Sequence, residues 1–196
     1  MKQMRKVSLL ASYPNPKNKR YVDDNLRTIK HRIVASYRDK EFYDGERIYG
    51  YGGFKYDGRW KDVAEKFSKR YKLKNTSSIL QLSSKKGFLL HDFKEKFPKI
   101  NVCGLETSEY AIRKTLKKTK KNIKKVETYT KLNFKNNSFD LVIALGVPYE
   151  YGLDGAIACL KEIQRVSKGN SFITLGSYKT RKEFWFYCRY DSSACS

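Results

Sequence analysis

The stretch from Ser78 to Ile112, SILQLSSKKGFLLHDFKEKFPKINVCGLETSEYAI, decides the fold, because the spacing of its apolar residues changes twice. Residues 79–82 form a short apolar run of strand length, and the polar loop SSKKG follows at 83–87. Apolar residues then recur at helical spacing up to Phe97, and a second strand-like run covers 100–105. This order predicts a strand, a tight loop, a helix and a parallel strand, which together make one βαβ unit.

Glu106 closes the second strand of this unit. It lies 19 positions after Gly87 (106 − 87). In nucleotide-binding βαβ units about 20 residues separate the glycine-rich loop from the acid that binds the ribose. A carboxylate suits that place because its two oxygens can accept hydrogen bonds from both ribose hydroxyls. The unit therefore predicts half of a nucleoside-binding site, with Glu106 as the ribose ligand.

Three segments carry a resemblance to a known family: KKGFLLHDFKEKFP at 85–98, VCGLETSEYAI at 102–112 and LNFKNNSFDLVIA at 132–144. They resemble the core of class I S-adenosylmethionine-dependent methyltransferases. The resemblance begins near Tyr43, where YDGERIYGYGGFKYDGRW is similar to one bacterial branch of the family, and it runs to about Tyr178. It implies a Rossmann-like fold and S-adenosyl-L-methionine as the cofactor.

The loop departs from the pattern of that family, which is acid-x-Gly-x-Gly-x-Gly. The matching positions here are Gln81, Ser83, Lys85 and Gly87, so one glycine remains and the acid has become an amide. Lys131 stands where the family often has an acid that contacts the adenine amine. The resemblance assigns cofactor binding to these five residues and Glu106. Because side chains obstruct close approach of the backbone and Lys85 adds a cation, we expect weakened or lost binding.

Composition limits the class of protein. A chain of 196 residues that is 40% hydrophobic fits one globular domain. Its formal charge of +22 indicates either a solvated basic surface or attraction to nucleic acid.

The cysteines and the apolar runs bear on the compartment. Cys103 and Cys159 lie in apolar runs and no CxxC pair occurs, so we expect core residues and a reducing cytoplasm. The apolar run VSLLA is too short for a signal peptide, and no run approaches the ~20 residues of a membrane span, so a membrane partner is not expected.

The chain is expected to form a single domain, 1–196, in three parts. Residues 1–72 hold a basic arm, two helices and a tyrosine- and glycine-rich segment, 73–178 the core, and 179–196 a tail. The arm, up to Arg20, is predicted to be extended and outside the core. The first helix is predicted to start near Asp23 or Asp24 and to present Leu26, Ile29, Ile33 and Tyr37 on one face. The segment 43–60 is either a lid over a ligand or a packed loop that covers the core.

Alternating strands and helices continue to the end of the core. Strands are predicted at 124–130, 139–145 and 171–175, with helices over 60–71, from Ser108 towards Leu116, and from a cap at Asp154. This pattern favours an α/β three-layer sandwich with a mostly parallel Rossmann-like sheet in the order 3-2-1-4-5. The resemblance implies further closing strands, which are expected to be missing before Ser196. The exposed edge of the fifth strand would then have to be covered by the tail or by a partner chain. Coverage by a partner chain would make the protein an oligomer.

No residue stands out as a general base, and no metal site is predicted. His91 is expected on the surface. Tyr149 and Glu150 follow the strand 139–145 at the carboxyl edge of the sheet, where such folds bind ligands, and they are the candidates for contact with a methyl acceptor. An ordinary loop is the alternative. Methyl transfer depends mainly on alignment of donor and acceptor, so the missing base does not exclude it.

Three functions are consistent with the sequence. The first is a methyltransferase that acts on a small molecule or a glycan precursor. The second is a catalytically inactive methyltransferase-like protein that serves as a binding or regulatory partner. The third, suggested by the charge, is an RNA-binding protein or an RNA methyltransferase.

Overall fold

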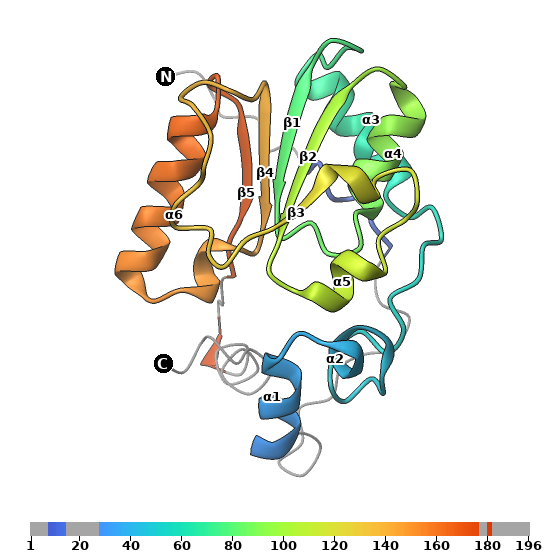
Figure 1. Cartoon of the computed structure of the whole chain (residues 1–196), viewed down its shortest axis with the longest axis vertical. Coiled ribbons are helices and arrows are strands. Elements are labelled where there is room, and N and C mark those ends of the chain that lie inside the picture. The colour runs from blue at the N-terminus through green and yellow to red at the C-terminus, as the bar shows by residue number, and fades with distance from the viewer. Residues whose placement is uncertain (1–7, 15–27, 177–179, 182–196) are drawn as a thin grey trace.

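Five parallel strands form the centre of the protein in the computed structural model, which describes residues 8–14, 28–176 and 180–181 (Figure 1). The sheet has the order β3-β2-β1-β4-β5, and every neighbouring pair is parallel. The predicted strand order is thus confirmed. The strands are β1 (Ser78–Leu82), β2 (Asn101–Glu106), β3 (Ile123–Lys125), β4 (Leu141–Leu145) and β5 (Ser171–Thr174).

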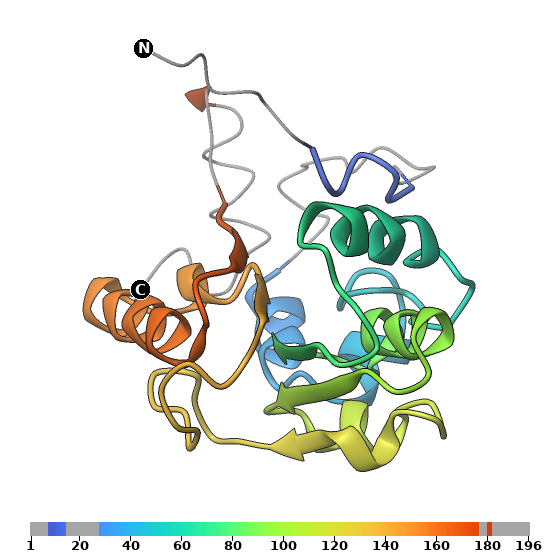
Figure 2. The same cartoon turned by 90° about the horizontal axis from the view of Figure 1, so that it is seen from above.

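Helices cover both faces of the sheet, which confirms the three-layer sandwich (Figure 2). On one face, α3 (Lys61–Arg70) and α4 (Phe88–Lys96) pack Phe67 and Phe93 against Ile79 and Ile143. On the other face, α6 (Leu153–Val166) packs Cys159 and Ile163 against Leu80 and Val142. Cys103 and Cys159 are both buried, as predicted.

Three short helices lie beyond the carboxyl ends of the strands: α1 (Ile29–Ser36), α2 (Lys40–Asp44) and α5 (Glu109–Arg113) (Figure 1). Tyr43 and Phe54 pack there with Phe88 at the start of α4 and Ala111 of α5, in a separate apolar cluster. The tyrosine- and glycine-rich segment is therefore folded onto the carboxyl edge of the sheet.

Several predicted boundaries were wrong. The third strand ends at Lys125 and does not continue to residue 130, because the segment after it is held by α6: Leu132 N–H donates to Glu162 Oε2 (2.6 Å), and Arg165 donates to the Leu132 carbonyl (2.8 Å). The helix that Ser108 caps ends at Arg113. β4 starts at residue 141, and α6 is capped by Gly152 instead of Asp154.

The N-terminal predictions also need correction. Within the described part of the arm, Leu9 is buried in the core beside α3, and the ring of Tyr13 lies 4.5 Å from that of Trp60. The predicted caps at Asp23 and Asp24 lie outside the described residues. The face of α1 is exposed at Ile29, Ile33 and Tyr37. His91 is half-buried beside Tyr56, instead of lying on the surface.

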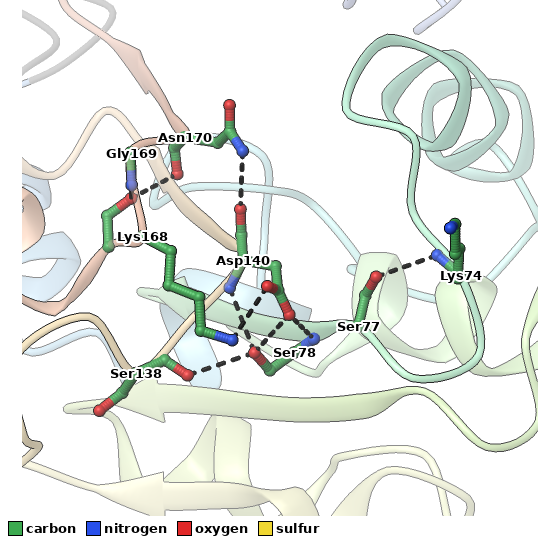
Figure 3. A network of polar contacts seen from close by, with 9 residues as sticks. Lys74, Ser77, Ser78, Ser138, Asp140, Lys168, Gly169 and Asn170 are labelled. Atoms are coloured by element: carbon green, nitrogen blue, oxygen red, sulfur yellow. Dashed lines mark hydrogen bonds and ion pairs between the residues drawn. The ribbon is translucent and has the colours of Figure 1, made fainter.

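A polar network joins the opposite, amino edge of the sheet (Figure 3). Asp140 Oδ2 accepts from both Ser78 N–H (2.7 Å) and Ser78 Oγ (2.8 Å), and its Oδ1 accepts from Lys168 Nζ (3.0 Å). Burial opposes ionisation of Asp140, but these hydrogen bonds prevail and lower its pKa. Because the network joins the starts of β1 and β4 to the turn before β5, its role is structural.

The remaining predictions concern the chain ends and membranes. The expected loss of closing strands and the tail fall mostly on residues outside the described ranges. β5 ends the sheet among the described strands, and its coverage by a partner stays a prediction. No helix in the described part of the chain is long and apolar enough to cross a membrane.

Candidate functional site

The loop 83–87 and Glu106 lie side by side at the carboxyl edge, as their spacing predicted. Lys85 N–H donates to Glu106 Oε2 (2.6 Å), and Ser84 N–H donates to the Leu105 carbonyl (3.0 Å). The loop packs closely on β2, since a Cβ at Gly104 would lie 2.7 Å from Ser84 Oγ. The end of β1 and the end of β2 therefore form one continuous surface.

The loop backbone keeps a conformation that suits glycine. Ser83 has a φ of 51°, Lys85 of 56° and Gly87 of 73°. A side chain in this left-handed region costs about 1–2 kcal/mol per residue. The backbone thus adopts left-handed geometry at three alternate positions, two of which carry side chains.

Glu106 is almost fully enclosed, with 2% of its surface exposed. Besides Lys85, its carboxylate accepts from Thr107 N–H (3.1 Å) and Ser108 N–H (3.0 Å), both at Oε1. A carboxylate offers about four acceptor positions. In this conformation Glu106 can therefore accept one further hydrogen bond, and contact with two ribose hydroxyls requires rearrangement of the loop.

Two tyrosines lie near this carboxylate. Burial, and then the negative charge of Glu106, raise the pKa of the Tyr43 hydroxyl well above its usual value. The same two causes raise the pKa of Tyr129. Both tyrosines therefore stay neutral around Glu106 at physiological pH.

A cavity of about 420 Å³ opens beside the loop. Its size lies within the ~300–1,000 Å³ range of small-molecule sites. Gln81 Oε1 is buried in the wall and has no hydrogen-bond partner among the described residues. The other polar lining residues are Ser83, Ser84 and Lys85, and the aromatic ones are Tyr13, Tyr51, Phe54, Trp60 and Phe88.

Lys85 places a cation at this wall. Its side chain is half-buried, and its Nζ donates to Ser83 Oγ (2.6 Å). The ammonium is thus held over the loop and does not extend into solvent.

Lys86 and Asp44 form an anchor that the sequence did not predict. Lys86 is 5% exposed, and its Nζ donates to both Asp44 carboxylate oxygens (2.7 Å each) and to the Phe54 carbonyl (2.9 Å). Tyr110 Oη also donates to Asp44 (2.7 Å), which raises the pKa of Tyr110 to about 12. Burial opposes ionisation of Asp44, but the hydrogen bonds from Lys86 and Tyr110 outweigh it and lower the pKa.

The segment 43–60 combines features of both predicted alternatives, a lid over a ligand and a packed loop that covers the core. The segment is packed, through the Asp44–Lys86 pair and the aromatic cluster, and its Tyr51, Phe54 and Trp60 also line the cavity. A carboxylate among aromatic residues was the visible signal at Asp44, but nothing in the sequence pairs it with a lysine 42 positions away.

Three predicted residues, Lys131, Tyr149 and Glu150, lie away from both the loop and the cavity. Lys131 is exposed. Glu150, in the short 3-10 helix η2 (Pro148–Glu150), forms an ion pair with Arg38 (3.1 Å). The Tyr149 ring lies over Gly146, where a Cβ would come within 3.0 Å of it. None of the three lines the cavity, and Gly87 and Glu106 do not line it either, although Glu106 contacts the lining residue Lys85.

The sequence profile of a methyltransferase domain family matches residues 79–170. The match runs from β1 to the turn before β5 and includes the loop, Glu106 and Lys131. This match is consistent with the resemblance of the sequence to class I S-adenosylmethionine-dependent methyltransferases. No curated protein matches the sequence.

Solved structures with this fold share little sequence with the chain. The MccD protein is 20% identical over 64% of this chain and 59% of its own, with a TM-score of 0.50. A candidate S-adenosyl-L-methionine-dependent methyltransferase from Methanococcus maripaludis is 20% identical over 60% and 55%, with a TM-score of 0.49. PKMT2 from Rickettsia typhi, solved in complex with AdoHcy, is 21% identical over 52% and 21%, with a TM-score of 0.45. The chain spans between 41% and 59% of the length of the first three structures that it matches, and the likeness shows the fold alone.

Proposed function

We propose that the chain binds S-adenosylmethionine at the carboxyl edge of the sheet and transfers its methyl group to a small-molecule acceptor, such as a glycan precursor. The observation that carries this proposal is Gln81, which lines the 420 Å³ cavity and whose buried Oε1 lacks a hydrogen-bond partner among the described residues. A buried acceptor without a hydrogen bond costs about 1–3 kcal/mol. The ammonium of the methionine group is a donor that would satisfy it.

The cavity suits this ligand in part. Aromatic side chains make up much of its lining and attract cations such as a sulfonium. Lys85 repels the positive charges, but its Nζ is a suitable partner for the methionine carboxylate. The backbone at Ser83, Lys85 and Gly87 has the left-handed conformation that glycines adopt readily. We therefore expect a dissociation constant between micromolar and millimolar, roughly −8 to −4 kcal/mol.

Each residue has a defined task in this proposal. The ligand supplies an activated methyl group on its sulfonium. Glu106 accepts a ribose hydroxyl through the free position on Oε2, while Lys85 N–H holds that oxygen against the loop. Gln81 orients the amino-acid end. Methyl transfer then depends on how the cavity aligns the acceptor, and the aromatic walls favour an acceptor with an apolar face.

Calorimetry with S-adenosylmethionine and S-adenosylhomocysteine tests the proposal. Glu106→Gln and Glu106→Ala are expected to abolish binding, because the ribose loses its charged acceptor. Glu109→Ala is the matched control: this exposed glutamate pairs with Lys125, and binding should not change. Circular dichroism and thermal melting show whether each variant is folded.

A restored loop provides the second arm of the test. Gln81→Asp, Ser83→Gly and Lys85→Gly together are expected to strengthen binding at least tenfold, since a charged hydrogen bond contributes about 1.5–3 kcal/mol. Tight binding by the unaltered chain, with no gain in the restored loop, would mean that these substitutions are not damaging. Absence of binding in both forms would refute the proposal and favour the inactive partner protein.

A further inference from the structure

The segment 110–126 concentrates positive charge at one edge of the molecule. Its 17 residues contain no Asp or Glu and hold eight of the net 22 positive charges of the chain. It covers the end of α5, the 3-10 helix η1 (Lys120–Asn122) and β3. We call this surface the β3-edge strip, and its cations are Arg113, Lys114, Lys117, Lys118, Lys120, Lys121, Lys124 and Lys125.

Ion pairs neutralise two of the eight cations of the strip. Lys118 pairs with Glu95 (2.6 Å), and Lys125 pairs with Glu109 (2.6 Å). By contrast, Lys117, Lys120, Lys121 and Lys124 are exposed and form no ion pair with any residue that the structure describes. Outside the strip, one carboxylate can form ion pairs with two cations, as Glu65 does with Lys69 and Lys96. Most of the positive charge of the strip is therefore uncompensated by the described residues.

The fold places the strip along one edge of the sheet, with Lys124 over the ring of Phe134 and Lys125 beside α5. Among the described strands, β3 lies at the end of the sheet and pairs with β2 alone, in a register that places Lys124 beside Leu105 and Lys125 beside Glu106. α5 and β3 lie next to each other and lead to the carboxyl edge (Figure 1). The apolar Ala111 and Ile123 of the same segment are buried in the protein.

We propose that the β3-edge strip binds the phosphate backbone of RNA. Uncompensated ammonium groups attract phosphates as point charges and release the counterions of the polymer, without reading its sequence. Binding to a lipid surface is strengthened by apolar side chains that enter the bilayer, and Ala111 and Ile123 face the core instead. The charge and the buried apolar positions thus favour a nucleic acid. The proposal does not depend on the cavity or on methyl transfer.

Fluorescence anisotropy with a labelled single-stranded oligouridine RNA and the full chain tests this surface between 50 and 200 mM salt. Each phosphate contact on a single strand contributes about −0.7 to the slope of log affinity against log salt concentration. The quadruple variant Lys117→Gln, Lys120→Gln, Lys121→Gln and Lys124→Gln should lose at least about tenfold in affinity at low salt and reduce the steepness of that slope by about 3.

A matched control separates position from total charge. The control replaces four lysines outside the strip by Gln and so removes the same number of charges. These exposed lysines are Lys55, Lys74, Lys99 and Lys161. This control is expected to bind RNA within about twofold of the unaltered chain. Equal losses in the two variants would overturn the proposal, as would RNA binding that is absent or insensitive to salt. Binding of the strip to vesicles rich in phosphatidylserine, without binding to RNA, would assign the strip to membranes. That result would also overturn the proposal.

Discussion

The buried Lys86–Asp44 pair leads to the sharpest prediction about this protein. It joins the segment 43–60 to the loop after β1, through three hydrogen bonds from one ammonium. Lys86→Met keeps the length of the side chain and removes the charge. Asp44 would then retain Phe54 N–H and Tyr110 Oη as donors, but no cation.

The expected cost follows from the burial of the two partners. Removal of one member of a buried ion pair costs about 3–5 kcal/mol. The Lys86 side chain is 6% exposed but that of Asp44 is 25% exposed, so water screens the remaining carboxylate and the lower end, about 3 kcal/mol, applies. For a chain of this size about 2–4 °C of melting temperature correspond to 1 kcal/mol. We therefore expect a decrease of roughly 6–12 °C.

Urea and thermal denaturation measure this loss, and Lys85→Met is the matched control. The Lys85 ammonium contacts one hydroxyl, so its removal should cost about 1 kcal/mol or less. The double variant Asp44→Asn with Lys86→Met should recover part of the loss, because no unpaired charge remains. The reasoning is refuted if Lys86→Met costs no more than Lys85→Met.

Three further predictions concern other parts of the molecule. Burial raises the pKa of Asp92, although Tyr56 donates a hydrogen bond to it, so the native state holds this proton more tightly than the unfolded chain and stability falls as pH rises above about 4. Asp92→Asn should therefore melt higher than the unaltered chain at pH 7 and show a flatter pH profile, and a lower melting temperature would contradict this. Gly87→Ala should lose about 1–2 kcal/mol in urea denaturation, because φ is 73° and the new Cβ would lie 3.1 Å from Thr119 Oγ1; a loss below about 0.5 kcal/mol would show that the position tolerates a side chain. Ser78→Ala should lose about 1 kcal/mol of stability through Asp140 without changing ligand affinity, since it acts at the opposite edge of the sheet, and a change in affinity measured by calorimetry would argue against this separation.

The sequence was sufficient to predict the part of the site that lies within one βαβ unit. Gly87 and Glu106 are separated by one helix and one strand, so the 19-residue spacing (106 − 87) fixed their proximity before any tertiary contact was known. The contact between Lys85 N–H and Glu106 follows from that geometry. Gln81 in β1, and Ser83 and Lys85 in the loop after it, were candidates because they match positions of the family pattern, and all three line the cavity.

Residues contributed by distant segments could not be predicted. Leu9 and Tyr13 belong to a basic stretch with prolines nearby, and their packing beside α3 depends on how the chain returns to the sheet. Glu150 was a candidate for acceptor contact because it follows β4, but Arg38, 112 positions earlier, pairs with it. Charge and spacing along the chain contain no information about such partners.

By itself, the sequence determined the order of the strands, the layers and the edge at which the loop and Glu106 meet, because the period of apolar residues and right-handed crossovers leave few arrangements. Only the tertiary structure decided what surrounds that edge: the Lys86–Asp44 anchor, the aromatic walls of the cavity and the enclosure of Glu106. The physical reason is that periodicity fixes which face of an element is buried, whereas a hydrogen bond or ion pair between distant segments depends on side-chain positions that exist only after the chain has packed.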